Sequence, residues 1–395
     1  MKISHKYLVE VIVFISYVLF AMAWVGGAAS MPQIMSSMHI DSLASASFIS
    51  GMVTIAKIVG TFGAAWIALK FGIKYAFFIA SLLVTIGLLT PLAPNYELLL
   101  LSRFLMGLGG AFMIVYFNPI VMHYFPVEER PVINGLNAVA FNVGTGIVLW
   151  QMDTINQLTG DWKSSLILFS IASVLFAIVW LLVQFEPTKN NQQSTEEEKE
   201  NYSYWDGIKD KFNWIYGLTY SGLLAFYICL FTFYPKAGIS QSKWVIGFGI
   251  IGTLAGIIYS KKIPQRIPII RWSGAVMVLT IIGVSFSTLD WLQTLSAVVL
   301  GFFIFFPITA LVSIPHELPR MTSQRITVIF SLFYSISYLF STIILWLFGK
   351  LVDLYAGDYT ASFVLISIVS ITFFIGSFFL PETGNKTIKE VPCAE

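Results

Sequence analysis

Twelve long apolar runs dominate the sequence and restrict the folds that it can adopt. A run of roughly 20 apolar residues can cross the hydrocarbon core of a bilayer as an α-helix. A helix is required there because no water is present to satisfy the backbone N–H and C=O groups. We therefore predict an all-α membrane protein with twelve transmembrane helices. The runs lie at about residues 8–30, 45–69, 75–93, 97–124, 132–153, 164–186, 214–235, 243–260, 268–288, 290–314, 326–350 and 360–380.

The composition agrees with a chain that lies mostly in lipid. Of the 395 residues, 57% are hydrophobic and 11% are charged, whereas a soluble domain is about 25% charged. The net charge of +2 is too small to indicate a nucleic-acid partner, so the partners we expect are the lipid bilayer and a small-molecule substrate. Cys229 and Cys393 are far apart in the sequence and predict neither a disulfide framework nor a metal site. No metal or cofactor is expected, and we expect a monomer.

Lysine and arginine are distributed unevenly between the loops, and this asymmetry predicts the orientation. With the N-terminus inside, seventeen of these residues lie in inner segments and four in outer segments. Positive residues are enriched in cytoplasmic loops, so both termini are predicted to be cytoplasmic. The first run is longer than a signal-peptide core and leads to no clear cleavage site. We expect a multi-pass protein of the cell membrane, here a bacterial inner membrane.

One extended polar stretch divides the chain into two halves. Residues 187–213 are rich in Glu, Lys, Asn and Gln, a composition that cannot bury enough apolar surface to fold alone. We predict a six-helix bundle at 1–186, a cytoplasmic linker at 187–213 and a second six-helix bundle with a short cytoplasmic tail at 214–395. A regulatory or docking role for the linker stays open. This layout is typical of parallel-repeat transporters, whose substrate site lies at the midplane between the halves.

The loop between the second and third runs resembles a family motif. Gly72 and Lys74 match the pattern G-x-L-x-D-R-x-G-R-K of the major facilitator superfamily, and Lys70 keeps the charge of its first Arg. The resemblance implies a gating role for these three residues. The sequence departs from the motif at Ala65, Leu69 and Ile73. Because Leu69 replaces the Asp, the gating salt bridge usually attributed to that Asp lacks its acid here.

The fourth and fifth runs extend the resemblance over nearly the whole chain. Arg103, Gly107 and Gly109 fit the family pattern R-x-x-x-G-x-G. The segments 124–126 and 135–144 resemble the nitrate/nitrite and cyanate porter-like branches, which carry an F-P loop before an Asn- and Gly-rich helix. The chain is thus similar to major facilitator transporters, which implies two six-helix bundles that move solutes by alternating access.

Two positive charges fall within the runs, and these are the strongest candidates for a binding site. Lys57 lies near the middle of the second run, about 18 Å of helix from its inner end, and an intramembrane charge is a functional hypothesis by default. Arg103 carries a planar fork that suits oxyanions. The alternative for Lys57 is a structural pairing. The alternative for Arg103 is a structural role in which it binds backbone carbonyl oxygens of neighbouring helices. We expect no Asp or Glu deep in any span, and this favours an anion or a zwitterion as substrate.

Polar and aromatic residues at helical spacing are expected to complete the cavity. Tyr17 and Trp24 are seven residues apart and share a helix face, and buried Tyr and Asn side chains need hydrogen-bond partners. Core packing is the alternative for each aromatic residue. The neighbouring pair His316 and Glu317 is predicted to gate or relay protons, with a solvated role as the alternative. The other residues that we expect to contact substrate are Asn118, Asn137, Asn142, Tyr227, Tyr334 and Tyr338.

Enzyme signatures are missing from the sequence. The glycines at 107–110 lie inside an apolar run and not after a strand, so they do not form a nucleotide loop. No Walker motif indicates drive by ATP. We predict a secondary active transporter of a small anionic or zwitterionic solute and not an enzyme. The alternative is an exporter of drugs, siderophores or metabolites on the same fold; a membrane-embedded enzyme or a receptor without flux is a third possibility.

Overall fold

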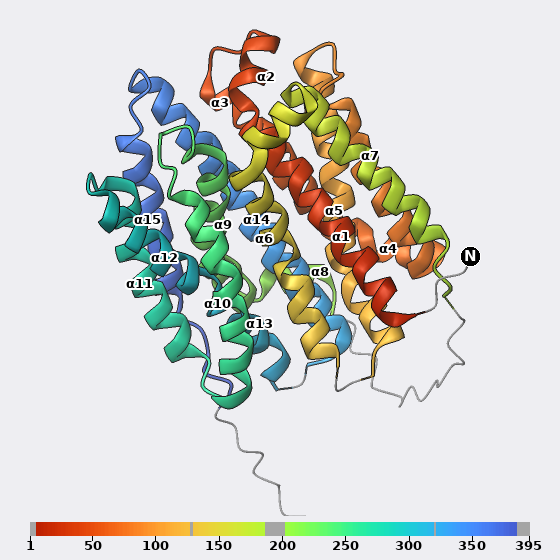
Figure 1. Cartoon of the computed structure of the whole chain (residues 1–395). Coiled ribbons are helices and arrows are strands. Elements are labelled where there is room, and N and C mark those ends of the chain that lie inside the picture. The colour runs from red at the N-terminus through yellow and green to blue at the C-terminus, as the bar shows by residue number, and fades with distance from the viewer. Residues whose placement is uncertain (1–4, 127–128, 186–201, 320, 385–395) are drawn as a thin grey trace, which may run out of the picture.

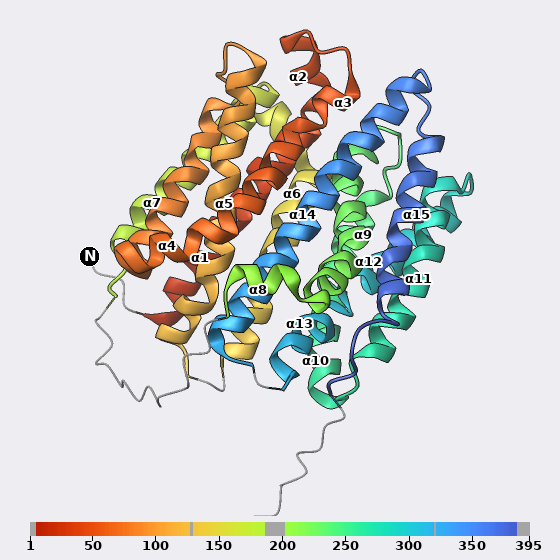
Figure 2. The same cartoon turned by 180° about the vertical axis from the view of Figure 1, so that it is seen from behind.

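The computed structural model describes residues 5–126, 129–185, 202–319 and 321–384, and the regular elements of these residues are helices. Figures 1 and 2 show two helical bundles side by side, one from red to yellow-green and one from green to blue. The first bundle contains α1 (Lys6–Ala29), α2 (Met31–Met38), α3 (Leu43–Ala46), α4 (Phe48–Thr85), the 3-10 helix η1 (Ile86–Leu89), α5 (Tyr96–Tyr124), α6 (Arg130–Thr159) and α7 (Trp162–Leu181). The second contains α9 (Lys211–Phe233), α10 (Ser242–Lys262), α11 (Ile267–Phe286), α12 (Asp290–Phe305), α13 (Ile308–Glu317), α14 (Ser323–Leu354) and α15 (Thr360–Gly376).

All twelve predicted runs form helices. Ten candidate spans among the described residues are long and apolar enough to cross a membrane. One of these, residues 48–89, contains the second and third runs together, and the shorter apolar helix α15 supplies the last run. The predicted all-helical fold is therefore confirmed.

A single glycine separates the second run from the third inside α4. Gly72 has φ 75° and ψ 159°, a left-handed backbone conformation that residues with a Cβ rarely adopt. No atom lies within 4 Å of the place where a Cβ would stand, so the backbone and not crowding favours glycine here. The bend lets one continuous segment cross the membrane twice.

Part of the predicted linker is helical. Residues 204–209 form α8 (Tyr204–Lys209), whose first turn is closed by a capping box between Ser203 and Asp206. α8 packs on α14, and the ring of Tyr204 lies edge-on to that of Phe62 at 5.1 Å. The linker residues 187–201, the tail residues 385–395 and Cys393 lie outside the described residues.

Glycines allow the helices of the first bundle to pack closely. A Cβ on Gly109 of α5 would stand 2.5 Å from the Ala80 carbonyl oxygen and 2.7 Å from the Val84 nitrogen of α4. By contrast, the nearest atom to a Cβ on Gly63 of α4 is 3.6 Å away, on Phe112. The α4–α5 contact at Gly109 therefore depends on the absence of a side chain.

Gly109→Ala is expected to destabilise the protein by about 1–3 kcal/mol, because the backbone of α4 must move to make room. Gly63→Ala is the matched control and should leave stability unchanged or slightly higher, because its site has room and Ala favours a helix. Thermal unfolding of the purified variants in one detergent measures both effects. Equal midpoints for Gly109→Ala and the unsubstituted protein would contradict the packing argument.

α6 packs on α10 between the two bundles, and further polar contacts join the bundles at one end of the molecule. We call the end where α1 begins the terminal end, and the opposite end, which carries α2 and α3, the distal end (Figure 1). At the distal end the carboxylate of Asp353 on α14 accepts hydrogen bonds from Ser42 Oγ at 2.8 Å, Leu43 N at 2.8 Å and Ala44 N at 2.9 Å. The ammonium of Lys236 donates to the carbonyl oxygen of Ala28 at 2.7 Å.

Hydroxyl pairs continue the contact between the bundles from the distal end toward the middle. Three such pairs join the halves: Ser50 with Thr232 at 3.3 Å, Thr54 with Thr342 at 2.6 Å, and Thr61 with Ser335 at 3.4 Å. On the terminal side of this level, cavities separate α4 and α5 from α13 and α14. The structure is thus closed at the distal end and hollow toward the terminal end.

Asp353→Ala is expected to loosen the distal closure. Hydrogen bonds to a charged group contribute about 1.5–3 kcal/mol, so we expect a roughly 10- to 100-fold shift toward conformations that are open at the distal end. Spin labels on cysteines placed at Gln33 and Asp290, in a protein with its two native cysteines replaced by Ser, would report a longer distance between the bundles. The control is Asp358→Ala, because among the described residues the hydrogen bonds of that carboxylate come from the neighbouring Thr360. Matching distance distributions for Asp353→Ala and its parent would refute this role.

Candidate functional site

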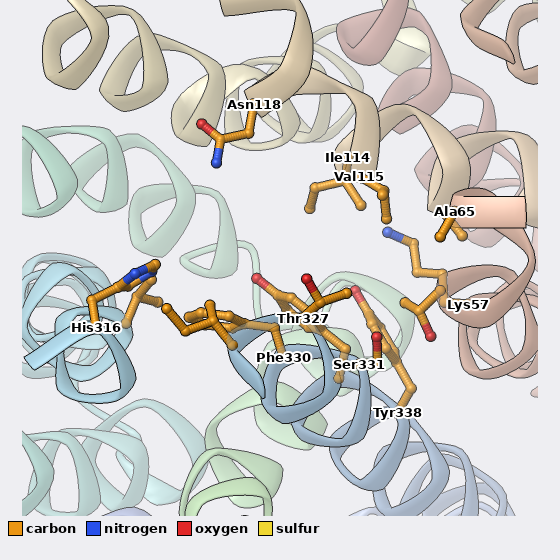
Figure 3. A pocket seen from close by; sticks show the side chains of 15 residues that line it. Lys57, Ala65, Ile114, Val115, Asn118, His316, Thr327, Phe330, Ser331 and Tyr338 are labelled. Carbon is orange, nitrogen blue, oxygen red and sulfur yellow. The ribbon is translucent and has the colours of Figure 1, made fainter. Parts of the chain in front are cut away.

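Two adjoining cavities lie between the bundles. The central cavity has a volume of about 470 Å³ and the terminal cavity about 360 Å³. Side chains of α4, α5, α13 and α14 line both of them. Figure 3 shows the terminal cavity, with the ammonium of Lys57 pointing into it and Asn118 and His316 across the space from it. The shared lining residues are Lys57, Ile114, Asn118, Val312, His316, Tyr334 and Tyr338.

Lys57 lies at the junction of the two cavities. Its side chain is buried, and its ammonium donates to the Tyr17 hydroxyl at 3.3 Å. No Asp or Glu is among the described residues that line either cavity. Aromatic rings stabilise a nearby ammonium through their negative faces. The ammonium lies between 5.2 and 5.8 Å from five ring centroids, those of Tyr17, Phe20, Trp24, Phe141 and Tyr338.

Buried polar atoms without partners surround this ammonium. Among the described residues, Trp24 Nε1 and Asn142 Nδ2 make no hydrogen bond, and both side chains line the central cavity. Asn142 Oδ1 is already occupied by the Tyr227 hydroxyl, which donates at 2.6 Å. A buried donor that lacks an acceptor costs about 1–3 kcal/mol. Both atoms of the Asn137 amide, another lining residue, are also unpaired, so the described wall of the central cavity offers a ligand or water three unused N–H donor groups and one carbonyl acceptor.

Nine of the ten predicted substrate residues line the central cavity. They come from α1, α4, α5, α6, α9 and α14, so segments far apart in the sequence meet at one place. Their roles stay predictions, but their convergence is a feature of the structure. The nine residues are Tyr17, Trp24, Lys57, Asn118, Asn137, Asn142, Tyr227, Tyr334 and Tyr338.

Arg103 is the tenth, and it lines neither cavity. Its side chain is 1% exposed, and its guanidinium donates to three backbone carbonyl oxygens. The acceptors are Ile49 at 2.9 Å, Ala23 at 2.8 Å and Trp24 at 2.7 Å. Arg103 thus ties α5 to α1 and α4, and of the two roles considered for it this geometry matches the structural one.

The predicted gating residues fall into two groups at the terminal end. The ammonium of Lys70 lies over the ring of Trp66 at 4.9 Å. Gly72 makes the bend in α4, and the carbonyl oxygen of Lys74 accepts a hydrogen bond from Trp180 Nε1 at 2.8 Å. These residues hold the turn between two spans to α7.

His316 and Glu317 point to different surroundings although they are neighbours. His316 lines both cavities. The carboxylate of Glu317 instead accepts hydrogen bonds from Arg266 Nη2 at 2.6 Å and from Thr383 Oγ1 at 2.6 Å. Glu317 therefore fastens the end of α13 to the α10–α11 connection, while His316 faces the cavities.

Glu10 is a buried acid that the sequence analysis missed. We expected no Asp or Glu deep in any span and did not consider Glu10, which lies near the start of α1 and is 3% exposed. A residue near the start of an apolar run is expected to face water. In the structure α6 packs along α1 and covers Glu10. Its carboxyl group lies near the side chain of Asn137, and neither group forms a hydrogen bond of ordinary geometry among the described residues.

Several lining rings also escaped prediction. Phe141 is central among them, because its ring lies within 6.4 Å of the rings of Tyr17, Phe20, Trp24, Tyr227 and Phe231. The signal was present in the sequence, since Phe141 precedes Asn142 in a run that was already assigned to the site. An aromatic residue in an apolar run has no distinctive pattern, so packing was the default interpretation.

Comparison with known proteins identifies the fold and the family. The profile of the Major Facilitator Superfamily matches residues 13–342. The inward-open structure of the xylose transporter XylE from E. coli superposes with a TM-score of 0.75 at 15% identity, over 97% of this chain and 98% of that one. A crystal structure of a D-xylose–proton symporter gives a TM-score of 0.74 at 16% identity, over 98% of this chain and all of that one. At 15–16% sequence identity these structures show the fold alone.

Curated relatives add partial matches. An uncharacterized protein of Campylobacter jejuni is 27% identical over 269 residues, which are 64% of this chain and 82% of that protein. The galactose–proton symporter of Escherichia coli K12 is 29% identical over 153 residues, or 38% of this chain and 32% of the symporter. The family profile covers most of the chain, and the fold agrees with it along its whole length. The chain therefore belongs to the major facilitator superfamily and is a multi-pass membrane transporter rather than an enzyme.

Proposed function

We propose that the protein is a secondary transporter of a small solute that carries a negative charge, either an anion or a zwitterion held by its anionic end. One observation carries the proposal: among the described residues that line the cavities, Lys57 is the sole Lys, Arg, Asp or Glu, and three of the four unpaired polar groups of the central cavity are N–H donors. A buried ammonium without a counter-ion favours a negatively charged ligand. The N–H groups of Trp24 and Asn142 donate hydrogen bonds, so they suit an oxyanion and not a cation.

The arrangement of the halves supports alternating access. Lys57 belongs to α4 of the first bundle, and Tyr338 and Tyr334 belong to α14 of the second. A ligand held between them contacts both bundles and so favours the conformations in which the bundles approach each other around it. With the predicted orientation, the terminal end faces the cytoplasm, and the present structure is open inward.

A sugar is the second candidate substrate. The galactose–proton symporter is a partial relative, and aromatic rings with amide side chains suit a polyol as well. A neutral sugar would leave the ammonium of Lys57 without compensation for its charge, so the anion remains the better match.

A thermal-shift screen of the purified full-length protein separates the candidates. The panel contains nitrate, nitrite, cyanate, acetate, benzoate, glycine, galactose and xylose. We expect stabilisation by at least one anion, reaching about 2.7 kcal/mol at a concentration of 100 times Kd. Uptake of that anion into proteoliposomes then tests transport. Stabilisation by sugars with none by any anion would overturn the proposal in favour of the second candidate.

A further inference from the structure

We infer that the central cavity selects a monoanion with a ring-bearing or otherwise bulky apolar body, such as an aromatic monocarboxylate, over inorganic oxyanions and dianions. This inference rests on the proposed function and narrows its substrate class. Three features of the cavity support it: the number of positive charges, the chemistry of the walls and the size of the space.

The charge of the site matches one negative group. Lys57 supplies the single ammonium among the described lining residues, and Arg103 is committed to backbone carbonyls. His316 lines both cavities and lies across the space from Lys57 (Figure 3), but an imidazole is largely neutral at neutral pH. A second negative charge held in this buried space would have no cation beside it, and an uncompensated buried charge is strongly disfavoured.

The donors gather at one part of the wall. Lys57 contacts both Trp24 and Tyr17, because its ammonium lies 5.3 Å from the centroid of the Trp24 ring and 3.3 Å from the Tyr17 hydroxyl. The unpaired Nε1 of Trp24 belongs to this group. An oxyanion can therefore be held at one end, as a head group, by donors that come from α1 and α4.

The rest of the wall is largely aromatic and aliphatic. Trp24 and Phe141 are 5.3 Å apart in a T-shaped arrangement, and Tyr227 and Phe305 are 5.2 Å apart in another. Such rings bind flat or apolar groups through their faces and edges. The ring-bearing residues that line the central cavity are Tyr17, Trp24, Phe117, Phe141, Tyr220, Tyr227, Phe231, Phe305, Tyr334 and Tyr338.

The size of the space favours a ligand with a body. A cavity of about 470 Å³ lies in the range of sites for organic small molecules. Nitrate or formate would occupy the head-group end alone and leave water against the apolar walls. An apolar body displaces that water, and burial of apolar surface is favourable in proportion to its area.

Calorimetric titration of the purified full-length protein tests this selectivity. The probes are benzoate, cyclohexanecarboxylate, acetate, nitrate, the dianion phthalate and the neutral amide benzamide. We expect benzoate and cyclohexanecarboxylate to bind at least about 10-fold more tightly than the four other probes, which corresponds to about 1.4 kcal/mol. Acetate or nitrate binding as tightly as benzoate would overturn the inference and leave the proposed function standing. Phthalate as tight as benzoate would also overturn it, whereas binding of sugars with no anion binding would overturn the proposed function itself.

A ring substitution provides the second arm. Phe141→Leu removes a ring at the centre of the aromatic wall and should weaken benzoate binding several-fold while changing acetate binding by less than about 2-fold. If Phe141→Leu does not fold, Phe231→Leu takes its place in the same experiment, because Phe231 also lines the central cavity. Phe77→Leu is the matched control, because this buried ring does not line the cavity and instead packs on Trp180, with 4.4 Å between the ring centroids. This substitution should change neither benzoate nor acetate affinity. An equal loss of benzoate and acetate affinity in the Phe141 or Phe231 variant would contradict recognition of the body by the rings.

Discussion

Lys57→Met is expected to weaken anion binding by roughly 10- to 100-fold, because hydrogen bonds to a charged group contribute about 1.5–3 kcal/mol. Methionine keeps a linear side chain of similar length, so the rings that surround the ammonium keep most of their packing. Removal of a buried charge without a counter-ion should leave the thermal midpoint unchanged or raise it. Calorimetric titration with benzoate measures the loss, and thermal unfolding in the same detergent shows that the fold is intact.

Two further variants sharpen the Lys57 experiment. Lys70→Met is the matched control on the same helix, because the Lys70 ammonium lies over exposed rings and does not line a cavity. It should bind benzoate like the unsubstituted protein. Lys57→Arg keeps the charge but not the shape and should retain part of the affinity. Unchanged benzoate binding by Lys57→Met would remove Lys57 from the site and the anion proposal with it.

Arg103→Met is expected to cause the largest loss of stability, about 3–5 kcal/mol, because each buried acceptor that is left without a donor costs about 1–3 kcal/mol. Three carbonyl oxygens, on Ala23, Trp24 and Ile49, lose their donor at once. Arg103→Lys keeps the charge, but lysine lacks the planar guanidinium that reaches all three acceptors. We therefore expect an intermediate loss of stability. The thermal midpoint in detergent and the yield of folded protein measure the effect.

Binding separates the two roles that the sequence left open for Arg103. If Arg103 is a structural tie, the Arg103→Lys variant that remains folded should bind benzoate within about 3-fold of the unsubstituted protein. A variant with an unchanged midpoint and a lost affinity would reverse the assignment and make Arg103 a substrate ligand. Lys57→Met should show the opposite combination, with its affinity lost and its midpoint kept.

The helices of this fold could be predicted because hydrophobic length is a strong local signal. Each predicted run became a helix, and even the bend at Gly72 falls where the motif places a loop. The break at Phe306 and Pro307, between α12 and α13, did not interrupt the apolar pattern and was not predicted. The helix α8 was read as part of a solvated linker, because six polar and aromatic residues carry no periodicity of their own.

The cavity could be predicted in part for a similar reason. Charges and amides are rare in apolar runs, so Lys57 and Asn142 were conspicuous and both line the cavity. Arg103 was just as conspicuous, but a single sequence does not reveal which carbonyl oxygens a guanidinium will meet. The burial of Glu10 could not be predicted, because it depends on how α6 lies against α1 and that placement has no local signature in the sequence.

The hydroxyl contacts between the halves have a consequence for how the transporter responds to its medium. Of the side-chain contacts between the halves in the described structure, three are pairs of neutral hydroxyls, and Asp353 and Lys236 bind backbone and hydroxyl groups rather than each other. Dissolved ions screen interactions between charges but leave neutral hydrogen bonds almost untouched, and water can take the place of a hydroxyl partner. The balance between closed and open forms should therefore vary little with ionic strength, so that a change in the salt content of the cell leaves the populations of the two forms nearly unchanged.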